Sequence, residues 1–178
     1  MADHASIPVL FSTPEIAAKV KEMAEAIRKA MGTEFMVIAL LKGGFVFSAD
    51  LVRALHHAGC SPQIDFLTLS SYGEGTESTG TVALAKDITD SVQGKKVLLV
   101  DDILESGRTL AYAKELLLKH DASSVSIAVL LEKPGKRKVN FHADFVGFTV
   151  PDKFVVGYGL DFANHYRELP FIGYLEKH

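Results

Sequence analysis

The sequence has a single cysteine, no long hydrophobic run and no signal-like start, and each absence excludes a class of protein. Cys60 is the only cysteine, which excludes an intramolecular disulfide and favours a reducing compartment. No apolar run reaches the ~18 residues that a membrane helix needs. Residues 1–8 also lack a basic region followed by an apolar stretch. We therefore expect a cytoplasmic protein with no membrane partner.

An excess of positive charge is also missing. The chain has 19 Lys and Arg residues against 22 Asp and Glu residues, which gives a net charge of −3, and its pI is near 6.2. This balance offers no basic face for nucleic acid, so we expect no nucleic-acid partner. With 178 residues, 48% hydrophobic and 23% charged, the composition is that of one globular domain with a substantial core.

The chain repeats a strand, a polar loop and a helix. A capping box at residues 12–15 begins the first helix, and Gly32 ends it. Further helices are predicted after residue 44 and after residue 109. Continuous apolar runs indicate strands that are buried on both faces, as in a parallel sheet. Such strands are predicted over Phe35–Leu41, Ile64–Leu69, Val82–Ala85, Val97–Val100 and Val125–Leu131.

The stretch Val97–Leu110 combines a buried strand with polar residues that suit a phosphorylated sugar. Asp101 and Asp102 follow the strand directly, and ligands of open α/β sheets bind at this edge. The loop Ser106–Thr109 then opens a helix, where free N–H groups, hydroxyls and a guanidinium converge on an anion. Two acids beside a phosphate site fit a ribose, whose hydroxyls would donate to them, with Mg²⁺ balancing the charge.

The whole Val97–Leu110 stretch resembles the phosphoribosyl-pyrophosphate signature of the type I phosphoribosyltransferases. Further on, Val150–Asp161 and the pair Tyr166-Arg167 resemble the purine-binding hood of the hypoxanthine-guanine branch. The resemblance implies an α/β fold of the type I phosphoribosyltransferases, with a central mostly parallel sheet flanked by helices. It also implies one domain over residues 1–178, with a core of about 35–150, a small hood from the N-terminal segment and about 151–178, and a mobile lid loop at about 71–81.

The activity that this resemblance implies is purine salvage. The 5-phosphoribosyl group would pass from phosphoribosyl pyrophosphate to N9 of hypoxanthine or guanine, giving IMP or GMP and pyrophosphate, with Mg²⁺ as cofactor. A homodimer or homotetramer is implied as well. Two alternatives stay open: a xanthine-preferring phosphoribosyltransferase, and a non-catalytic, nucleotide-sensing RNA-binding regulator on the same scaffold. The pI near 6.2 argues against the regulator.

The resemblance also assigns roles around phosphoribosyl pyrophosphate. The ribose hydroxyls fall to Asp101 and Asp102, the 5′-phosphate to Ser106, Gly107, Arg108 and Thr109, and the pyrophosphate to Lys42, Gly43 and Arg167. The family's peptide bond corresponding to Leu41 and Lys42 is typically cis. Asp161, with Asp101 and Asp102, would hold Mg²⁺ directly or through water. Ser71 and Tyr72 match the start of the family's lid.

On the purine side, Phe154 would stack on the base and the Val155 backbone would bind its edge. Lys133 would donate to the 6-oxo group, and because lysine is donor-only, adenine would be rejected. Glu105 occupies the position at purine N7 where the family usually has a catalytic Asp, so the carboxylate is longer by one methylene. Asp101 stands where Glu is common, which is a milder change.

Overall fold

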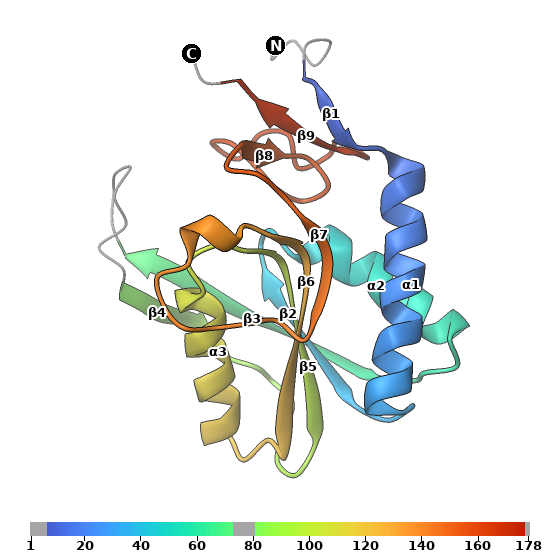
Figure 1. Cartoon of the computed structure of the whole chain (residues 1–178). Coiled ribbons are helices and arrows are strands. Elements are labelled where there is room, and N and C mark those ends of the chain that lie inside the picture. Colours follow the sequence, from blue (N-terminus) through green and yellow to red (C-terminus); the bar gives the residue numbers. More distant parts are fainter. Residues whose placement is uncertain (1–6, 73–80, 177–178) are drawn as a thin grey trace.

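The computed structural model describes residues 7–72 and 81–176. A six-stranded sheet with the order β4-β3-β2-β5-β6-β7 forms its centre (Figure 1). All neighbouring strands in this sheet run parallel except β4, which is antiparallel to β3. The predicted mostly parallel sheet is therefore confirmed. The strands are β2 Met36–Leu41, β3 Gln63–Tyr72, β4 Thr81–Lys86, β5 Lys96–Leu104, β6 Ser124–Glu132 and β7 Phe145–Thr149.

Helices cover both faces of this sheet. Helices α1 (Thr13–Met31) and α2 (Phe45–His57) lie on one face, and α3 (Arg108–Lys119) lies on the other (Figure 1). The predicted start of α1 is confirmed, because the Ser12 N–H donates to Glu15 Oε2 at 2.8 Å. A short 3₁₀ turn, Pro134–Lys136, follows β6. Across the described ranges, no helix is both long and apolar enough to traverse a bilayer.

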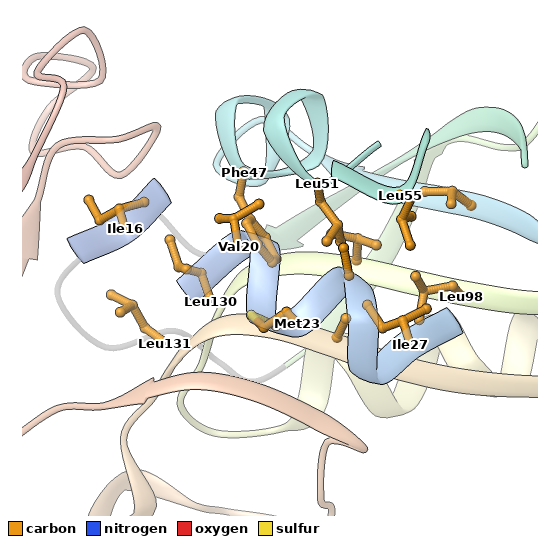
Figure 2. Close-up of a cluster of buried hydrophobic side chains, with 14 of the residues drawn as sticks. Ile16, Val20, Met23, Ile27, Phe47, Leu51, Leu55, Leu98, Leu130 and Leu131 are labelled. Atoms are coloured by element: carbon orange, nitrogen blue, oxygen red, sulfur yellow. The ribbon is translucent and has the colours of Figure 1, made fainter. Parts of the chain in front are cut away.

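The hydrophobic core consists of two clusters, one on each side of the sheet. Neighbouring strand residues point to opposite faces, so Leu98 packs towards α1 and α2 while Leu99 packs towards α3. Figure 2 shows α1, with Ile27 along it, facing the α2 side chains and Leu98 of β5. Both leucines have no exposed surface. The prediction that β5 is buried on both faces is confirmed for its first half.

The second half of β5 departs from the sequence prediction. The strand was expected to end at Val100, but it continues to Leu104. Its pairing with β6 runs on to Leu104 opposite Glu132, whereas its pairing with β2 stops at Val100 opposite Ala39. Residues 101–104 are therefore held on one side only, and the two aspartates lie within the strand rather than after it.

A second, three-stranded sheet lies beyond one end of the main sheet (Figure 1). It consists of β1 (Val9–Phe11), β9 (Ile172–Leu175) and β8 (Phe154–Val156), in the order β1-β9-β8 and antiparallel throughout. The sequence patterns did not predict these strands, because strands of three or four residues show too little alternation. The small sheet joins a segment near the start of the chain to one near its end.

Tyr158, just after β8, ties this region to α2. Its side chain is buried, and its hydroxyl donates to the Asp50 carboxylate of α2. Asp50 also pairs with Arg53 one turn further along the helix. Burial, followed by the hydrogen bond to Asp50, raises the pKa of Tyr158 well above its ordinary value. The hydroxyl therefore stays protonated and keeps this donor at neutral pH.

We expect Tyr158→Phe to lower the free energy of unfolding by about 1–3 kcal/mol at pH 7, because Asp50 loses a buried donor. The folded-state pKa of Tyr158 is raised, so this stabilisation is complete below the unfolded-state pKa of about 10 and is lost above it. Urea denaturation should show that the difference in free energy of unfolding between wild type and variant is smaller at pH 10.5 than at pH 7. Tyr112→Phe, on α3, is the control, and a pH-independent difference would contradict the assignment.

Candidate active site

Most of the predicted site residues line two adjoining hollows at the carboxyl edge of the main sheet. The first, of about 220 Å³, is lined by the end of β5 and the start of α3, including Asp101, Ser106 and Thr109. The second, of about 280 Å³, lies against residues that come from far apart in the sequence. Both hollows share Asp102, Ile103 and Glu105 as walls. A ligand with two parts therefore has room in both, with β5 between them.

Four separate segments complete the second hollow. They are the loop after β2, the end of β6, strand β8 and the segment that follows β8. Each segment supplies at least one side chain or backbone group that the sequence assigned to pyrophosphate, purine or metal. The lining residues are Gly43, Asp102, Ile103, Glu105, Lys133, Phe154, Val155, Leu160, Asp161 and Arg167.

The two aspartates form the acidic floor between the hollows. Asp102 is only 9% exposed, and its backbone N–H donates to Asp101 Oδ1 at 2.9 Å. Burial and then the neighbouring Asp102 carboxylate raise the pKa of Asp101 well above its usual range. Burial also raises the pKa of Asp102, although the Arg167 charge acts against it. This floor favours ligands that bring hydrogen-bond donors or positive charge, such as sugar hydroxyls.

Two glycines allow the loop after β2 to approach β5 on one side and the segment after β8 on the other. A Cβ on Gly43 would lie 1.9 Å from Asp102 Oδ2, so only glycine lets the loop approach that carboxylate. A Cβ on Gly159 would lie 2.4 Å from the Gly43 carbonyl oxygen. Arg167 holds this contact, because its Nη1 donates to the Gly159 carbonyl at 2.6 Å and its Nη2 pairs with Asp161 Oδ1 at 2.8 Å.

Lys133 and Glu105 form an ion pair across the second hollow. The Lys133 Nζ donates to Glu105 Oε1. The lysine side chain is 8% exposed, whereas that of the glutamate is 45% exposed. A buried ammonium needs a partner, and here the partner is the carboxylate expected to handle a proton. Both side chains line the second hollow together with Phe154.

Comparison with known proteins identifies the scaffold that carries this arrangement. The sequence matches the phosphoribosyl transferase domain over residues 9–163. This chain belongs to the phosphoribosyltransferase family. It is 46% identical to the hypoxanthine-guanine phosphoribosyltransferase of Bacillus subtilis, covering 99% of this chain and 97% of the relative. It is 42% identical to the Escherichia coli hypoxanthine phosphoribosyltransferase, covering 94% of each. A solved Staphylococcus aureus hypoxanthine phosphoribosyltransferase aligns with a TM-score of 0.91 at 40% identity, over 99% of this chain and 95% of that one.

Not every predicted residue of the phosphoribosyltransferase site lines a hollow. The peptide bond between Leu41 and Lys42 is cis, as the family resemblance implied, but the Lys42 side chain is exposed. Arg108 is likewise exposed at the first position of α3. Ser71 and Tyr72 are the last residues of β3. The rest of the predicted lid up to residue 80 lies outside the described residues.

Three apolar side chains at the phosphoribosyltransferase site were not assigned from the sequence. Ile103 and Leu160 line the second hollow, and Phe162 meets the Phe154 ring edge-on, with centroids 5.5 Å apart. Apolar residues at strand ends and in loops look like ordinary core residues, so no sequence signal marks them.

The carboxylates of the phosphoribosyltransferase site do not form a metal cage by themselves in the described residues. Among residues 7–72 and 81–176, no three His, Cys, Asp or Glu side chains gather closely enough to hold an ion. Mg²⁺ often binds through one or two carboxylates together with substrate phosphates. Asp101 and Asp102 provide such carboxylates, whereas Asp161 already receives the Asn164 N–H at 2.8 Å and Arg167. The donor set therefore fits an ion that arrives with a phosphorylated substrate.

Replacement of Gly159 tests the contact between the loop after β2 and the segment after β8. Gly159 has φ of +99°, and a Cβ would collide with the Gly43 carbonyl oxygen. We expect Gly159→Ala to lower the free energy of unfolding by at least about 2 kcal/mol, measured by urea denaturation. Gly135→Ala is the matched control, because nothing lies within 4 Å of a Cβ at that position. Equal stability of the two variants would refute the close approach.

Proposed function

We propose that this chain transfers the 5-phosphoribosyl group from phosphoribosyl pyrophosphate to N9 of hypoxanthine and guanine, as a purine salvage enzyme. The observation that carries this proposal is the pair of hollows sharing Asp102 and Glu105. One has the loop and helix start of a phosphate site, and the other has an aromatic ring, a buried lysine and an arginine. The relatives are named for hypoxanthine and guanine, so neither the xanthine-preferring enzyme nor the RNA-binding regulator is supported.

The phosphoribosyl pyrophosphate would lie across both hollows. Its 5′-phosphate would sit in the Ser106–Thr109 loop, at the N-terminus of α3, where backbone N–H groups and the helix dipole attract anions. Its ribose hydroxyls would donate to Asp101 and Asp102. Its pyrophosphate would meet the Gly43 backbone, Lys42 and Arg167, and Lys42 would have to turn inwards from its exposed position.

The purine would fill the rest of the second hollow. Phe154 is 48% exposed and lines the hollow, so its ring is accessible to a planar base that would stack on it. The Val155 backbone would bind the edge of the base, and Lys133 would donate to its 6-oxo group. The 6-amino group of adenine has no acceptor for a lysine, and it would leave a buried ammonium poorly satisfied. This contact supports 6-oxopurines as the substrate class.

The reaction breaks the bond between C1′ and a pyrophosphate oxygen and forms the bond between C1′ and N9. Pyrophosphate leaves with the bonding electrons and positive charge builds at C1′, so the chain must orient both reactants and keep water away. Glu105 is the group proposed to take the purine ring proton at N7. The Lys133 ammonium beside it would hold the carboxylate in place until the purine arrives.

Further features of the enzyme are part of the same proposal. Mg²⁺ bound with the pyrophosphate would neutralise charge on the leaving group, and Asp101, Asp102 and Asp161 are the residues proposed to hold it.

The β1-β9-β8 sheet would act as the hood of a single domain whose core is about 35–150. Cys60 is free and buried, which suits a cytoplasmic enzyme. Assembly as a homodimer or homotetramer is proposed from the family.

An absorbance or radiolabel assay tests the function directly. Protein, phosphoribosyl pyrophosphate and Mg²⁺ are incubated separately with hypoxanthine, guanine, xanthine, adenine and uracil. We expect IMP from hypoxanthine and GMP from guanine, and no AMP from adenine, because Lys133 needs an acceptor at position 6. Product from xanthine alone would favour the xanthine enzyme. No product from any base would overturn the proposed function and direct the next experiment to RNA binding.

Glu105→Gln tests the proposed proton-handling group. The amide oxygen can still accept from Lys133 but cannot take a proton, so we expect kcat to fall by about 10²-fold or more while binding of phosphoribosyl pyrophosphate is largely kept. Steady-state kinetics and calorimetric binding measure the two effects. Glu115→Gln, on the exposed face of α3, is the control. Turnover close to that of wild type would remove Glu105 from the mechanism.

A further inference from the structure

Arg137 is a partly buried cation that no substrate role accounts for. Its side chain is 17% exposed and belongs to the segment after β6. Its Nη1 donates to the carbonyl oxygens of Glu105, at 2.6 Å, and of Leu104, at 3.2 Å. Its Nη2 pairs with Glu132 Oε1 at 2.5 Å. One guanidinium therefore joins the end of β5 to the end of β6.

Both ends that Arg137 joins carry a residue of the proposed purine site. Glu105 is itself one of its acceptors, and Lys133 directly follows Glu132. The Lys133 N–H also donates to the Leu104 carbonyl at 2.9 Å, so that carbonyl receives a backbone donor and a guanidinium donor together. Beyond Leu104, β5 has ended, and strand pairing no longer fixes the main chain of Glu105.

The phosphate loop next to Glu105 is held in a different way. The Ser106 carbonyl accepts backbone N–H groups from Lys138 at 2.9 Å and from Val139 at 3.3 Å. These bonds do not involve the Arg137 side chain. Loss of the guanidinium would therefore loosen Glu105 while backbone bonds still hold the loop proposed for the 5′-phosphate.

We propose that Arg137 is a positioning residue that fixes Glu105 relative to Lys133, so that the carboxylate and the ammonium meet the purine edge together. This inference rests on the proposed function. A planar guanidinium can donate to a carbonyl pair and to a carboxylate at the same time, whereas a lysine is a point donor with one nitrogen. The role should therefore be specific to arginine.

The experiment compares Arg137→Ala and Arg137→Lys with Lys138→Ala, which removes an exposed basic side chain from the adjacent position. The values of kcat and KM are measured with hypoxanthine and phosphoribosyl pyrophosphate, and thermal unfolding confirms that each variant is folded. We expect kcat to fall by about 10- to 100-fold in both Arg137 variants, because a misplacement of about 1 Å can cost 10²-fold. The KM for phosphoribosyl pyrophosphate should change by less than about 3-fold.

Two further readouts separate positioning from a general loss of structure. Adding Arg137→Ala to Glu105→Gln should lower kcat no further, because the group that Arg137 positions is already inactive. Free guanidinium at low millimolar concentration should restore part of the kcat of Arg137→Ala and none of the kcat of Glu105→Gln. Losses that multiply in the double variant, or Arg137 variants with the kcat of Lys138→Ala, would overturn the inference. Absence of nucleotide formation by the wild type would instead overturn the proposed function.

Discussion

The arrangement of the site depends on the unequal hydrogen bonding of β5. Its pairing with β2 stops at Val100, while its pairing with β6 continues to Leu104. The chain therefore keeps extended geometry through Asp101 and Asp102 although one side of the strand is open. The loop after β2 leaves the sheet at this level, and the absent side chain of Gly43 lets that loop press against Asp102. Asp102 is thus buried and Asp101 half-buried beside the open side of the strand, which costs free energy until a ligand with suitable donors binds.

The segment after β8 completes the site because it is fixed to α2 and to the loop after β2. Tyr158 donates to Asp50 of α2, and Gly159 packs on the Gly43 carbonyl at a distance that excludes a side chain. Arg167 then binds the Gly159 carbonyl. These contacts place Phe154 opposite β5, so the proposed stacking ring is positioned by contacts made several residues away from it.

The sequence predicted those parts of the molecule whose signals are local. The buried strands, the capping box of α1 and the polar loop that opens α3 follow from periodicity and residue type within a short window. The site required the family resemblance, because Lys133 and Phe154 are separated in sequence and each alone looks like surface or core. The extension of β5 and the role of Arg137 could not be predicted, since both depend on which strand still pairs and which carbonyls are left open.

The contact between Lys133 and Glu105 shows how the longer acid alters the free protein. An ammonium that is 8% exposed is destabilised unless a carboxylate is near, and Glu105 from the neighbouring strand end supplies one. A purine that accepts from Lys133 would take over part of this ion pair, so the Glu105 carboxylate would be released towards the ring as the base binds. An Asp would reach about one methylene less far from the same backbone position. Arg137 donates to the carbonyl at that backbone position, so the length of the side chain and the placement of the main chain together would determine whether the proposed base meets N7.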